Sequence, residues 1–209
     1  MSDTVVVLTS GAAPVAAGPL PAGALVVAAD GGADAALALG LRVDVAVGDF
    51  DSIVPATLAA LEAAGTRIER HPAAKDATDL ELALDEAIRL GARRILVLGS
   101  DGGRLDHLLG TLLLLASDAY AGVELDAVLG STRVHVIRGE RTLAGEPGET
   151  VSLFAAGGPA AGVTTAGLRY PLDGETLPPA TSRGVSNEFA AAEARISLAS
   201  GVLLAVRPG

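Results

Sequence analysis

Short valine-rich runs alternate with longer Ala- and Leu-rich stretches along the first half of the chain. The apolar runs cover residues 5–8, 25–29, 43–47 and 95–98. Helices are expected over residues 33–39, 55–64, 78–90 and 105–117. The helix at 78–90 is the best defined, because Thr78 and Glu81 form a capping-box pattern and Gly91 supplies a stop. This alternation predicts a mainly parallel sheet that is covered by helices on both faces.

The pattern changes after about residue 122, where Gly and Pro break the chain into short alternating segments. Strands are expected at residues 133–137, 150–154, 195–198 and 202–206. Residues 199–201 predict a hairpin turn between the last two strands. The expected fold class is therefore α/β plus all-β. It has a mainly parallel α/β/α domain over residues 1–122 and a smaller β-sandwich-like domain over residues 123–209.

Composition and charge limit where in the cell the protein is expected and which classes of partner it can bind. No apolar run approaches the roughly 18 residues that span a bilayer, and the N-terminus lacks the pattern of a signal peptide. We therefore expect a cytoplasmic protein without a membrane partner. The formal charge of −10 argues against a nucleic-acid partner, because phosphate backbones are bound by clustered Lys and Arg. The chain has no Cys, and its single lysine, Lys75, is not part of a P-loop sequence.

Acidic and glycine residues gather immediately after three of the predicted strands. The segments are Asp30-Gly31-Gly32 after residues 25–29, Gly48-Asp49-Phe50-Asp51 after residues 43–47, and Gly99 to His107 after residues 95–98. In open parallel sheets, ligands bind beyond the carboxyl ends of the strands. The three segments are therefore expected to contribute to one binding site.

Five aspartates make this expected site acidic. Asp49 and Asp51 are two residues apart and would point the same way in extended structure. At about 4 Å their charges would repel by roughly 4 kcal/mol at an effective dielectric of about 20. Asp76 and Asp79 stand at the start of the best-defined helix. Each pair also has an ordinary explanation, since Asp caps turns and stabilises helix N-termini. Together with Asp30, the two pairs favour Mg²⁺ bound jointly by carboxylates and a polyphosphate.

The turn Gly102-Gly103-Arg104 is suited to an anion. Glycines let backbone N–H groups approach a phosphate closely, and the planar guanidinium of Arg104 could clamp phosphate oxygens. The alternative is an ordinary connection in which Arg104 pairs with a nearby Asp. For His107, which follows Asp106 on a predicted helix, a structural role is the simpler interpretation.

Taken in order, these segments resemble the thiamine pyrophosphokinase family. The motifs are Ala29-Asp30-Gly31-Gly32-Ala33, Gly48-Asp49-Phe50-Asp51-Ser52, Lys75-Asp76-Ala77-Thr78-Asp79-Leu80-Glu81 and Gly102-Gly103-Arg104-Leu105-Asp106-His107. In the second half, two segments look like that family's thiamine-binding region: Gly167-Leu168-Arg169-Tyr170-Pro171-Leu172 and Ser182-Arg183-Gly184-Val185-Ser186-Asn187-Glu188-Phe189. The resemblance covers nearly the whole chain from about residue 24.

The resemblance implies transfer of the pyrophosphoryl group of ATP to the hydroxyl of thiamine, which gives thiamine diphosphate and AMP. It implies that the metal-nucleotide is held by Asp30, Asp49, Asp51 and Asp79. The catalytic candidates are Asp76, Arg104 and Asp106, and Asp106 is the candidate general base by position. The implied ligand-binding residues are Asp30, Gly31, Gly102, Gly103, Arg104, Ser186 and Asn187.

The family resemblance further implies a homodimer, in which thiamine lies between the α/β domain of one subunit and the β domain of the other. Ser186 and Asn187 would face that thiamine, although Ser-Asn is also common in hairpin turns. Some relatives place a Trp against the thiamine rings, and this chain has none. Phe189 or Tyr170 would then supply the apolar surface.

Three other interpretations of the sequence stay open. The first keeps the fold and the donor but uses another heteroaromatic alcohol, such as a hydroxymethylpterin. In the second, Asp49 is the nucleophile of a haloacid-dehalogenase-type phosphatase, although that motif is expected after the first strand. The third is a nucleotide or thiamine sensor without turnover, because binding residues alone do not establish chemistry.

Overall fold

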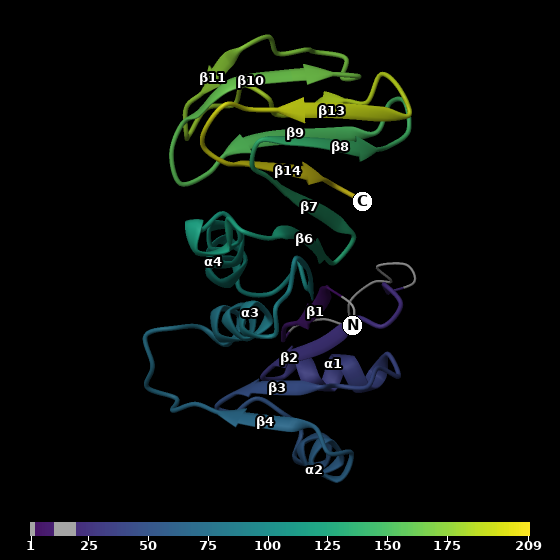
Figure 1. The fold of residues 1–209 in the computed structure, drawn as a ribbon, viewed down its shortest axis with the longest axis vertical. Helices are drawn as coiled ribbons and strands as arrows, with labels where there is room; N and C mark the ends of the chain where they lie inside the picture. The colour runs from purple at the N-terminus through teal and green to yellow at the C-terminus, as the bar shows by residue number, and fades with distance from the viewer. Residues whose placement is uncertain (1–2, 11–19) are drawn as a thin grey trace. The chain divides into compact units, whose positions relative to one another are not determined.

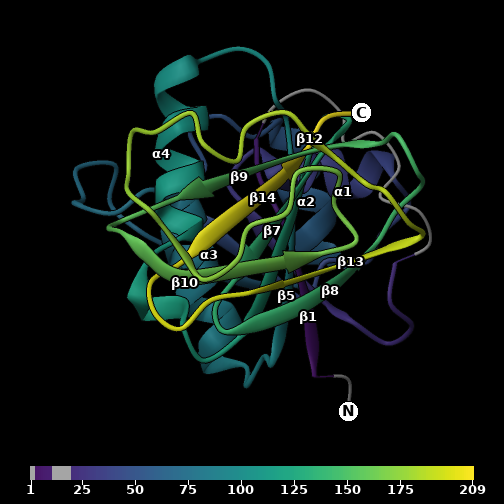
Figure 2. The same cartoon turned by 90° about the horizontal axis from the view of Figure 1, so that it is seen from above.

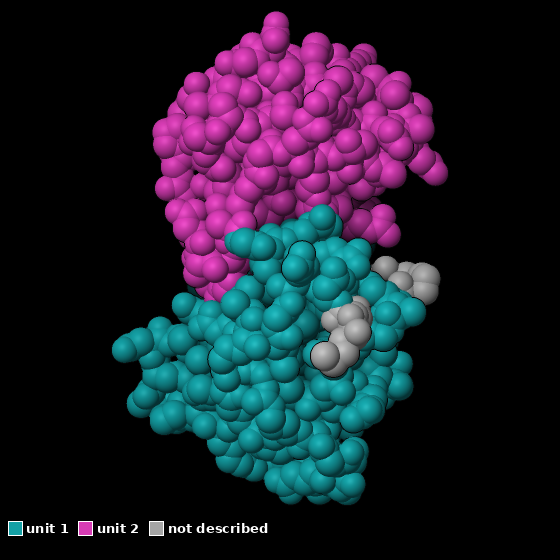
Figure 3. All heavy atoms as spheres, viewed as in Figure 1, with its two compact units in different colours: residues 1–111, 122–131 teal, residues 112–121, 132–209 magenta. Residues whose placement is uncertain are grey.

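The computed structural model describes residues 3–10 and 20–209. The chain divides into two compact units, which Figure 3 colours separately. The first unit comprises residues 1–111 and 122–131, and the second comprises residues 112–121 and 132–209. Within the described ranges, no helix combines the length and the apolar character that crossing a membrane requires.

The first unit is built on a parallel sheet (Figure 1). Its strands are β1 (Thr4–Leu8), β2 (Leu25–Ala29), β3 (Val45–Gly48), β4 (Arg67–Arg70), β5 (Arg94–Gly99) and β6 (Glu124–Leu129). Their order across the sheet is β6-β5-β1-β2-β3-β4. The chain winds outward from β1 to β4 and then returns to add β5 and β6 on the other side of β1. Such a reversal creates a crevice at the carboxyl ends of the strands, where ligands bind in sheets of this kind.

Helices cover both faces of this sheet. They are α1 (Gly32–Ala38), α2 (Pro55–Ala63) and α3 (Asp79–Arg89). A fourth helix, α4 (Leu105–Leu115), follows β5 and buries Leu115 alone. A 3₁₀ turn, η1, follows at Asp118–Tyr120. Helices α1 and α3 both contact β1 and β2, and Figure 2 shows them on the two sides of the strands. Val6 and Ala28 share a buried cluster with Ala33 of α1, while Val5 and Val27, which point the other way, are buried as well. The predicted doubly covered parallel sheet is thus confirmed.

The second unit contains two antiparallel sheets. The strands are β7 (Thr132–Ile137), β8 (Glu140–Ala144), β9 (Thr150–Ala155), β10 (Ala160–Ala166), β11 (Glu175–Leu177), β12 (Asn187–Glu188), β13 (Glu193–Ser197) and β14 (Leu203–Arg207). One sheet has the order β12-β9-β14-β7 and the other has the order β11-β10-β13-β8. Leu153 and Leu203 of the first sheet share one buried core with Val163 and Ile196 of the second. Two sheets packed through a common core form the expected β-sandwich.

Three details of the fold differ from what the sequence predicts. Strand β6 pairs in parallel with β5 and belongs to the first unit, whereas a boundary at residue 122 assigns it to the second. Strand β4 is not predicted, because its sequence is polar and it lies at the sheet edge. The predicted hairpin at residues 199–201 is wrong. Strand β13 pairs with β8 and β10, whereas β14 pairs with β7 and β9, so the turn carries the chain from one sheet to the other.

Candidate active site

Three aspartates converge at the carboxyl ends of two neighbouring strands. Asp30 directly follows β2, Asp49 directly follows β3, and Asp79 is the first residue of α3. Each contributes a carboxylate oxygen to a group whose members all lie within 4.8 Å of one another. The parallel pairing of β2 with β3 brings the first two together, and α3 contacts both strands. We call Asp30, Asp49 and Asp79 the aspartate cluster.

Asp30 is the buried member of the aspartate cluster. It is 4% exposed, and its Oδ1 has no hydrogen-bond partner in the described part of the chain. Burial raises the pKa of Asp30 above its ordinary value, and the charges of Asp79 and Asp49 add to this effect, while hydrogen bonds from Gly31 and Ser52 oppose it. A buried carboxylate oxygen without a donor is costly. A bound cation would satisfy it.

Gly48 makes the close approach of the carboxylates possible. Its φ is 152°, a backbone conformation that residues other than glycine rarely adopt. A Cβ atom at this position would lie 3.2 Å from both the Cβ of Asp30 and Oδ1 of Asp79. A larger residue would therefore push the aspartate cluster apart.

Lys75 lies inside the aspartate cluster, a position for which the sequence provided no role. Its Nζ is 3.1 Å from Oδ2 of Asp49 and 3.0 Å from Oδ1 of Asp79. Burial disfavours the charged ammonium, but hydrogen bonds to Asp79 and Asp49 outweigh this and raise the pKa of Lys75. The hydrogen bond from Lys75 in turn lowers the pKa of Asp49. Two signals could have revealed it: Lys75 is the single lysine, and it stands four residues before Asp79.

Asp51 lies apart from the three residues that form the cluster in the described chain. The backbone is not extended here, because Phe50 has a φ of 62°, so Asp49 and Asp51 do not alternate as in a strand. Asp51 is exposed, and its Oδ1 accepts a hydrogen bond of 2.8 Å from Ser52 Oγ. Its backbone N–H donates to Oδ1 of Asp49 at 3.2 Å. It thus supports Asp49 through its backbone.

The loop after β5 is open and exposed. The N–H of Gly102 donates to Ser100 Oγ at 3.0 Å, and Gly103 has a φ of 84°. Arg104 donates to both carboxylate oxygens of Asp106, at 3.2 and 2.5 Å, as the alternative interpretation of its sequence proposed. The hydrogen bond from Arg104 lowers the pKa of Asp106. Both side chains of this pair are largely exposed.

The remaining predicted residues of the first unit have different surroundings. Asp76 is exposed in the loop before α3, and His107 is exposed on α4. A Cβ atom at Gly31 would lie 3.0 Å from Ser10 Oγ, so this glycine allows the ends of β1 and β2 to approach each other. Of these residues, Gly31 contacts the aspartate cluster, through its hydrogen bond to Asp30.

In the second unit, Asn187 is buried and its amide group holds a neighbouring loop. Its Oδ1 accepts from the N–H groups of Tyr170 and Glu188 at 3.0 and 2.9 Å, and its Nδ2 donates to the carbonyl of Tyr170 at 2.7 Å. Ser186 is exposed and has a φ of 55°. Phe189 is 2% exposed, whereas Tyr170 is 56% exposed. Of the two aromatic candidates, Tyr170 is therefore the one that a ligand can reach.

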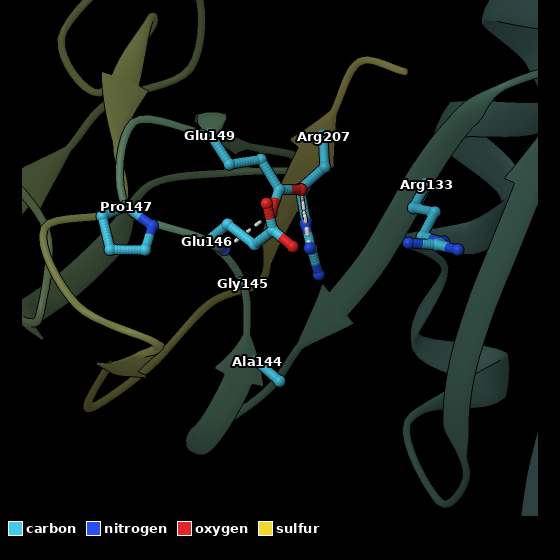
Figure 4. A pocket seen from close by; sticks show the side chains of 7 residues that line it. All are labelled: Arg133, Ala144, Gly145, Glu146, Pro147, Glu149 and Arg207. Atoms are coloured by element: carbon cyan, nitrogen blue, oxygen red, sulfur yellow. Dashed lines mark hydrogen bonds and ion pairs between the residues drawn. The ribbon is translucent and has the colours of Figure 1, made fainter.

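A hollow of about 540 Å³ also lies in the second unit (Figure 4). The residues that line it are Arg133, Ala144, Gly145, Glu146, Pro147, Glu149 and Arg207. Arg207 donates to Glu149 Oε1 at 2.8 and 2.6 Å, and its guanidinium stacks 5.1 Å from the centre of the Phe189 ring. No residue predicted from the sequence lines this hollow.

The fold and the aspartate cluster define a class of protein: an α/β unit with an acidic centre at its strand ends, followed by an antiparallel β unit. Models of two protein families match the chain. Residues 20–125 match the thiamin pyrophosphokinase catalytic domain, and residues 132–203 match the thiamin pyrophosphokinase vitamin B1 binding domain. The chain belongs to the thiamin pyrophosphokinase family.

Individual relatives agree with this assignment. The chain is 29% identical to thiamine pyrophosphokinase of Bacillus subtilis over 164 residues, which are 78% of this chain and 77% of the relative. It is 32% identical to thiamine pyrophosphokinase 1 of rice over 148 residues, which are 65% of this chain and 55% of the rice protein. The crystal structure of a thiamin pyrophosphokinase family protein from Enterococcus faecalis has a TM-score of 0.82 at 27% identity, with 100% and 99% of the two chains covered.

Proposed function

We propose that this protein transfers the pyrophosphoryl group of ATP to the hydroxyl of thiamine, so that thiamine diphosphate and AMP are formed. One observation carries the proposal. The aspartate cluster lies at the carboxyl ends of β2 and β3, inside the segment that matches the family's catalytic domain. The ATP requirement favours a cytoplasmic location.

Magnesium fits the aspartate cluster. The donors are carboxylate oxygens, the hard ligands that this ion prefers. The unpaired Oδ1 of Asp30 and the raised pKa of this residue both indicate a site where a bound cation would be stabilising. Asp30, Asp49 and Asp79 would hold the ion. A magnesium ion bound there would neutralise phosphate oxygens of ATP as charge develops on them.

Arg104 and the adjacent glycines are suited to the phosphates of ATP. Positioning and charge stabilisation account for most of the catalysis in phosphoryl-type transfer. The guanidinium of Arg104 now pairs with Asp106 in solvent, where an ion pair is weak, so it can turn to a phosphate at little cost. Gly102 and Gly103 leave open space around the same backbone: a Cβ on Gly102 would lie 3.6 Å from Ser100 Oγ, and one on Gly103 would be in open space.

Asp106 would act on the side of the acceptor, and Asp76 on the side of the phosphates. Because Arg104 lowers the pKa of Asp106, this carboxylate is ionised at neutral pH and is a weak base. It suits an acceptor of a hydrogen bond from the thiamine hydroxyl, which orients the attacking oxygen. In a loose transition state, a strong base is not required. Asp76, exposed before α3, would lie near the phosphates.

For thiamine binding we propose Ser186 and the exposed ring of Tyr170. Asn187 would contribute indirectly, because its amide group fixes the backbone of Tyr170. This division agrees with the match of residues 132–203 to the vitamin B1 binding domain.

We also propose that the chain forms a homodimer with active sites at the subunit interface. Helix α4 supports this proposal, because three leucines spaced four residues apart lie exposed on it: Leu105 (77%), Leu109 (56%) and Leu113 (56%). A row of exposed leucines on one helix is typical of a surface that contacts another protein. The variant Leu109→Glu should run as a monomer in sedimentation analysis and lose turnover. A dimeric Leu109→Glu variant would contradict a dimer through this helix.

The decisive experiment supplies purified protein with ATP, MgCl₂ and thiamine and identifies the nucleotide product. We expect AMP and thiamine diphosphate in equal amounts, with no product in EDTA. ADP would exclude pyrophosphoryl transfer, and inorganic phosphate alone would favour a phosphatase. AMP formed with a hydroxymethylpterin but not with thiamine would change the acceptor. Binding of ATP or thiamine without turnover would indicate a sensor.

A further inference from the structure

Lys75 occupies a position that the proposed reaction does not explain. Its side chain is 14% exposed, and its ammonium bridges Asp49 and Asp79, the two members of the aspartate cluster that reach solvent. Lys75 comes from the loop between β4 and α3, and Asp79 stands at the N-terminus of α3. The ammonium therefore joins the end of β3 to the start of α3.

A divalent ion and the ammonium compete for the carboxylates of Asp49 and Asp79. Oδ1 of Asp79 lies 3.0 Å from Nζ of Lys75, and a Cβ at Gly48 would lie 3.2 Å from this oxygen and from the Cβ of Asp30. Magnesium draws its oxygen ligands in to about 2.0–2.1 Å and accepts little distortion. Two cations cannot share one such oxygen at these distances without strong repulsion.

We propose that Lys75 is a positioning residue, an internal cation that holds the aspartate cluster together without metal and leaves it when a divalent ion binds. The inference rests on the magnesium site of the proposed function but not on the identity of the acceptor. Before metal binds, the ammonium neutralises one of the charges of Asp49 and Asp79 and keeps both carboxylates at the strand ends. Metal binding exchanges this cation for another, so the carboxylates need little rearrangement.

The single lysine of the chain allows a direct test on the intact protein. Lysine labelled with ¹³C at Cε gives one side-chain NMR signal, that of Lys75. We expect this signal to shift saturably as MgCl₂ is added, with the same midpoint as the calorimetric binding of the ion. A signal that stays unchanged while calorimetry shows Mg²⁺ bound would overturn the proposal, because the ammonium would then be a permanent structural ion pair.

Variants separate the charge of Lys75 from its packing. Lys75→Met keeps the length of the side chain and removes the charge. In EDTA it should lower Tm by about 2–6 °C, and it should bind Mg²⁺ about tenfold more tightly, because no ammonium competes. Lys75→Arg should restore Tm. Arg94→Met is a matched control, since Arg94 pairs with Asp3 at the opposite ends of the strands and the change in net charge is the same. It should leave Mg²⁺ affinity unchanged.

The outcomes distinguish this inference from the proposed function. Equal or weaker Mg²⁺ binding by Lys75→Met would overturn the inference, and so would absence of Mg²⁺ binding to both the wild type and Lys75→Met. If the Lys75 signal responds to MgCl₂ but no AMP is formed from ATP and thiamine, the inference stands and the proposed reaction fails. If AMP is formed while the signal does not respond, the reaction stands and the inference fails.

Discussion

Each unit of this protein removes an acidic side chain from water, Asp30 almost fully and Glu149 to 28% exposure, and the surroundings of the two carboxylates are opposite. In the second unit, Glu149 receives two hydrogen bonds from Arg207, whose side chain is 9% exposed. In the first unit, Asp30 is 4% exposed, and its Oδ1 has no donor among residues 3–10 and 20–209. Carboxylate oxygens of Asp49 and Asp79 lie within 4.8 Å of a carboxylate oxygen of Asp30.

The pKa directions express the same contrast. Hydrogen bonds from Arg207 outweigh burial and lower the pKa of Glu149, so its ionised form stabilises the fold. Burial raises the pKa of Asp30, so its ionised form destabilises the fold. Glu149, which is paired with an arginine, contributes to the stability of the fold. Asp30, whose Oδ1 has no donor, instead provides a negative charge that a bound cation can use.

The strongest test of this comparison is Asp30→Asn. The amide can donate to the neighbouring carboxylates, and Asn tolerates the positive φ of 45° found at this residue. We expect kcat/KM for AMP formation to fall by about 10³-fold, the scale of losing a charged group that stabilises the transition state. Tm in EDTA should instead rise by about 2–4 °C, the shift that corresponds to 1 kcal/mol in a chain of this size.

Lower stability of Asp30→Asn would remove the contrast, because Asp30 would then stabilise the fold as Glu149 does. Asp51→Asn is the matched control. Asp51 is exposed and lies outside the aspartate cluster of the described chain, so it should change Tm little. Its effect on kcat/KM also measures whether Asp51 serves as a ligand, as the family resemblance implies.

Arg104→Met extends the comparison to Asp106, an acid that is paired with an arginine but exposed to solvent. The Arg104–Asp106 pair lies in solvent, and exposed pairs contribute little to stability. We therefore expect Tm to stay unchanged, while kcat falls by about 10²-fold if Arg104 binds the phosphates. Thermal unfolding and initial rates of AMP release measure the two effects. A clear loss of stability would show that Arg104 is a structural residue.

The sequence predicts the aspartate cluster because the ends of the strands that carry it can be located from the hydrophobic pattern. Valine-rich runs locate β2 and β3, and the rule that ligands bind at the carboxyl ends of parallel strands then selects Asp30 and Asp49. Asp79 follows from the capping pattern at Thr78, whose Oγ1 accepts from the N–H of Glu81 at 3.2 Å. Each of these inferences uses a local pattern.

Features that depend on the backbone conformation of a single residue or on a distant contact are not predicted. The spacing of Asp49 and Asp51 suggests one orientation only if the chain is extended, and the φ of 62° at Phe50 breaks that condition. The ion pairs of Lys75 depend on how its loop folds back. The family resemblance implies that Asn187 faces thiamine, whereas the burial of its amide group against Tyr170 is a distant contact that the sequence does not reveal.

The smallest expected effect concerns Glu149→Gln in the second unit. Because the pKa of Glu149 is lowered in the folded state, its contribution to stability is present above its unfolded pKa of about 4.3 and is lost as pH falls through the folded value. We expect the variant to lose about 1 kcal/mol at pH 7, after allowance for solvent screening. The difference from wild type should vanish in strong acid. Urea unfolding between pH 7 and pH 3 measures this convergence, and Mg²⁺ affinity in the first unit serves as the control because it should not change. A stability difference that persists unchanged at pH 3 would mean that Glu149 acts through packing, and the contrast with Asp30 would then not be one of charge.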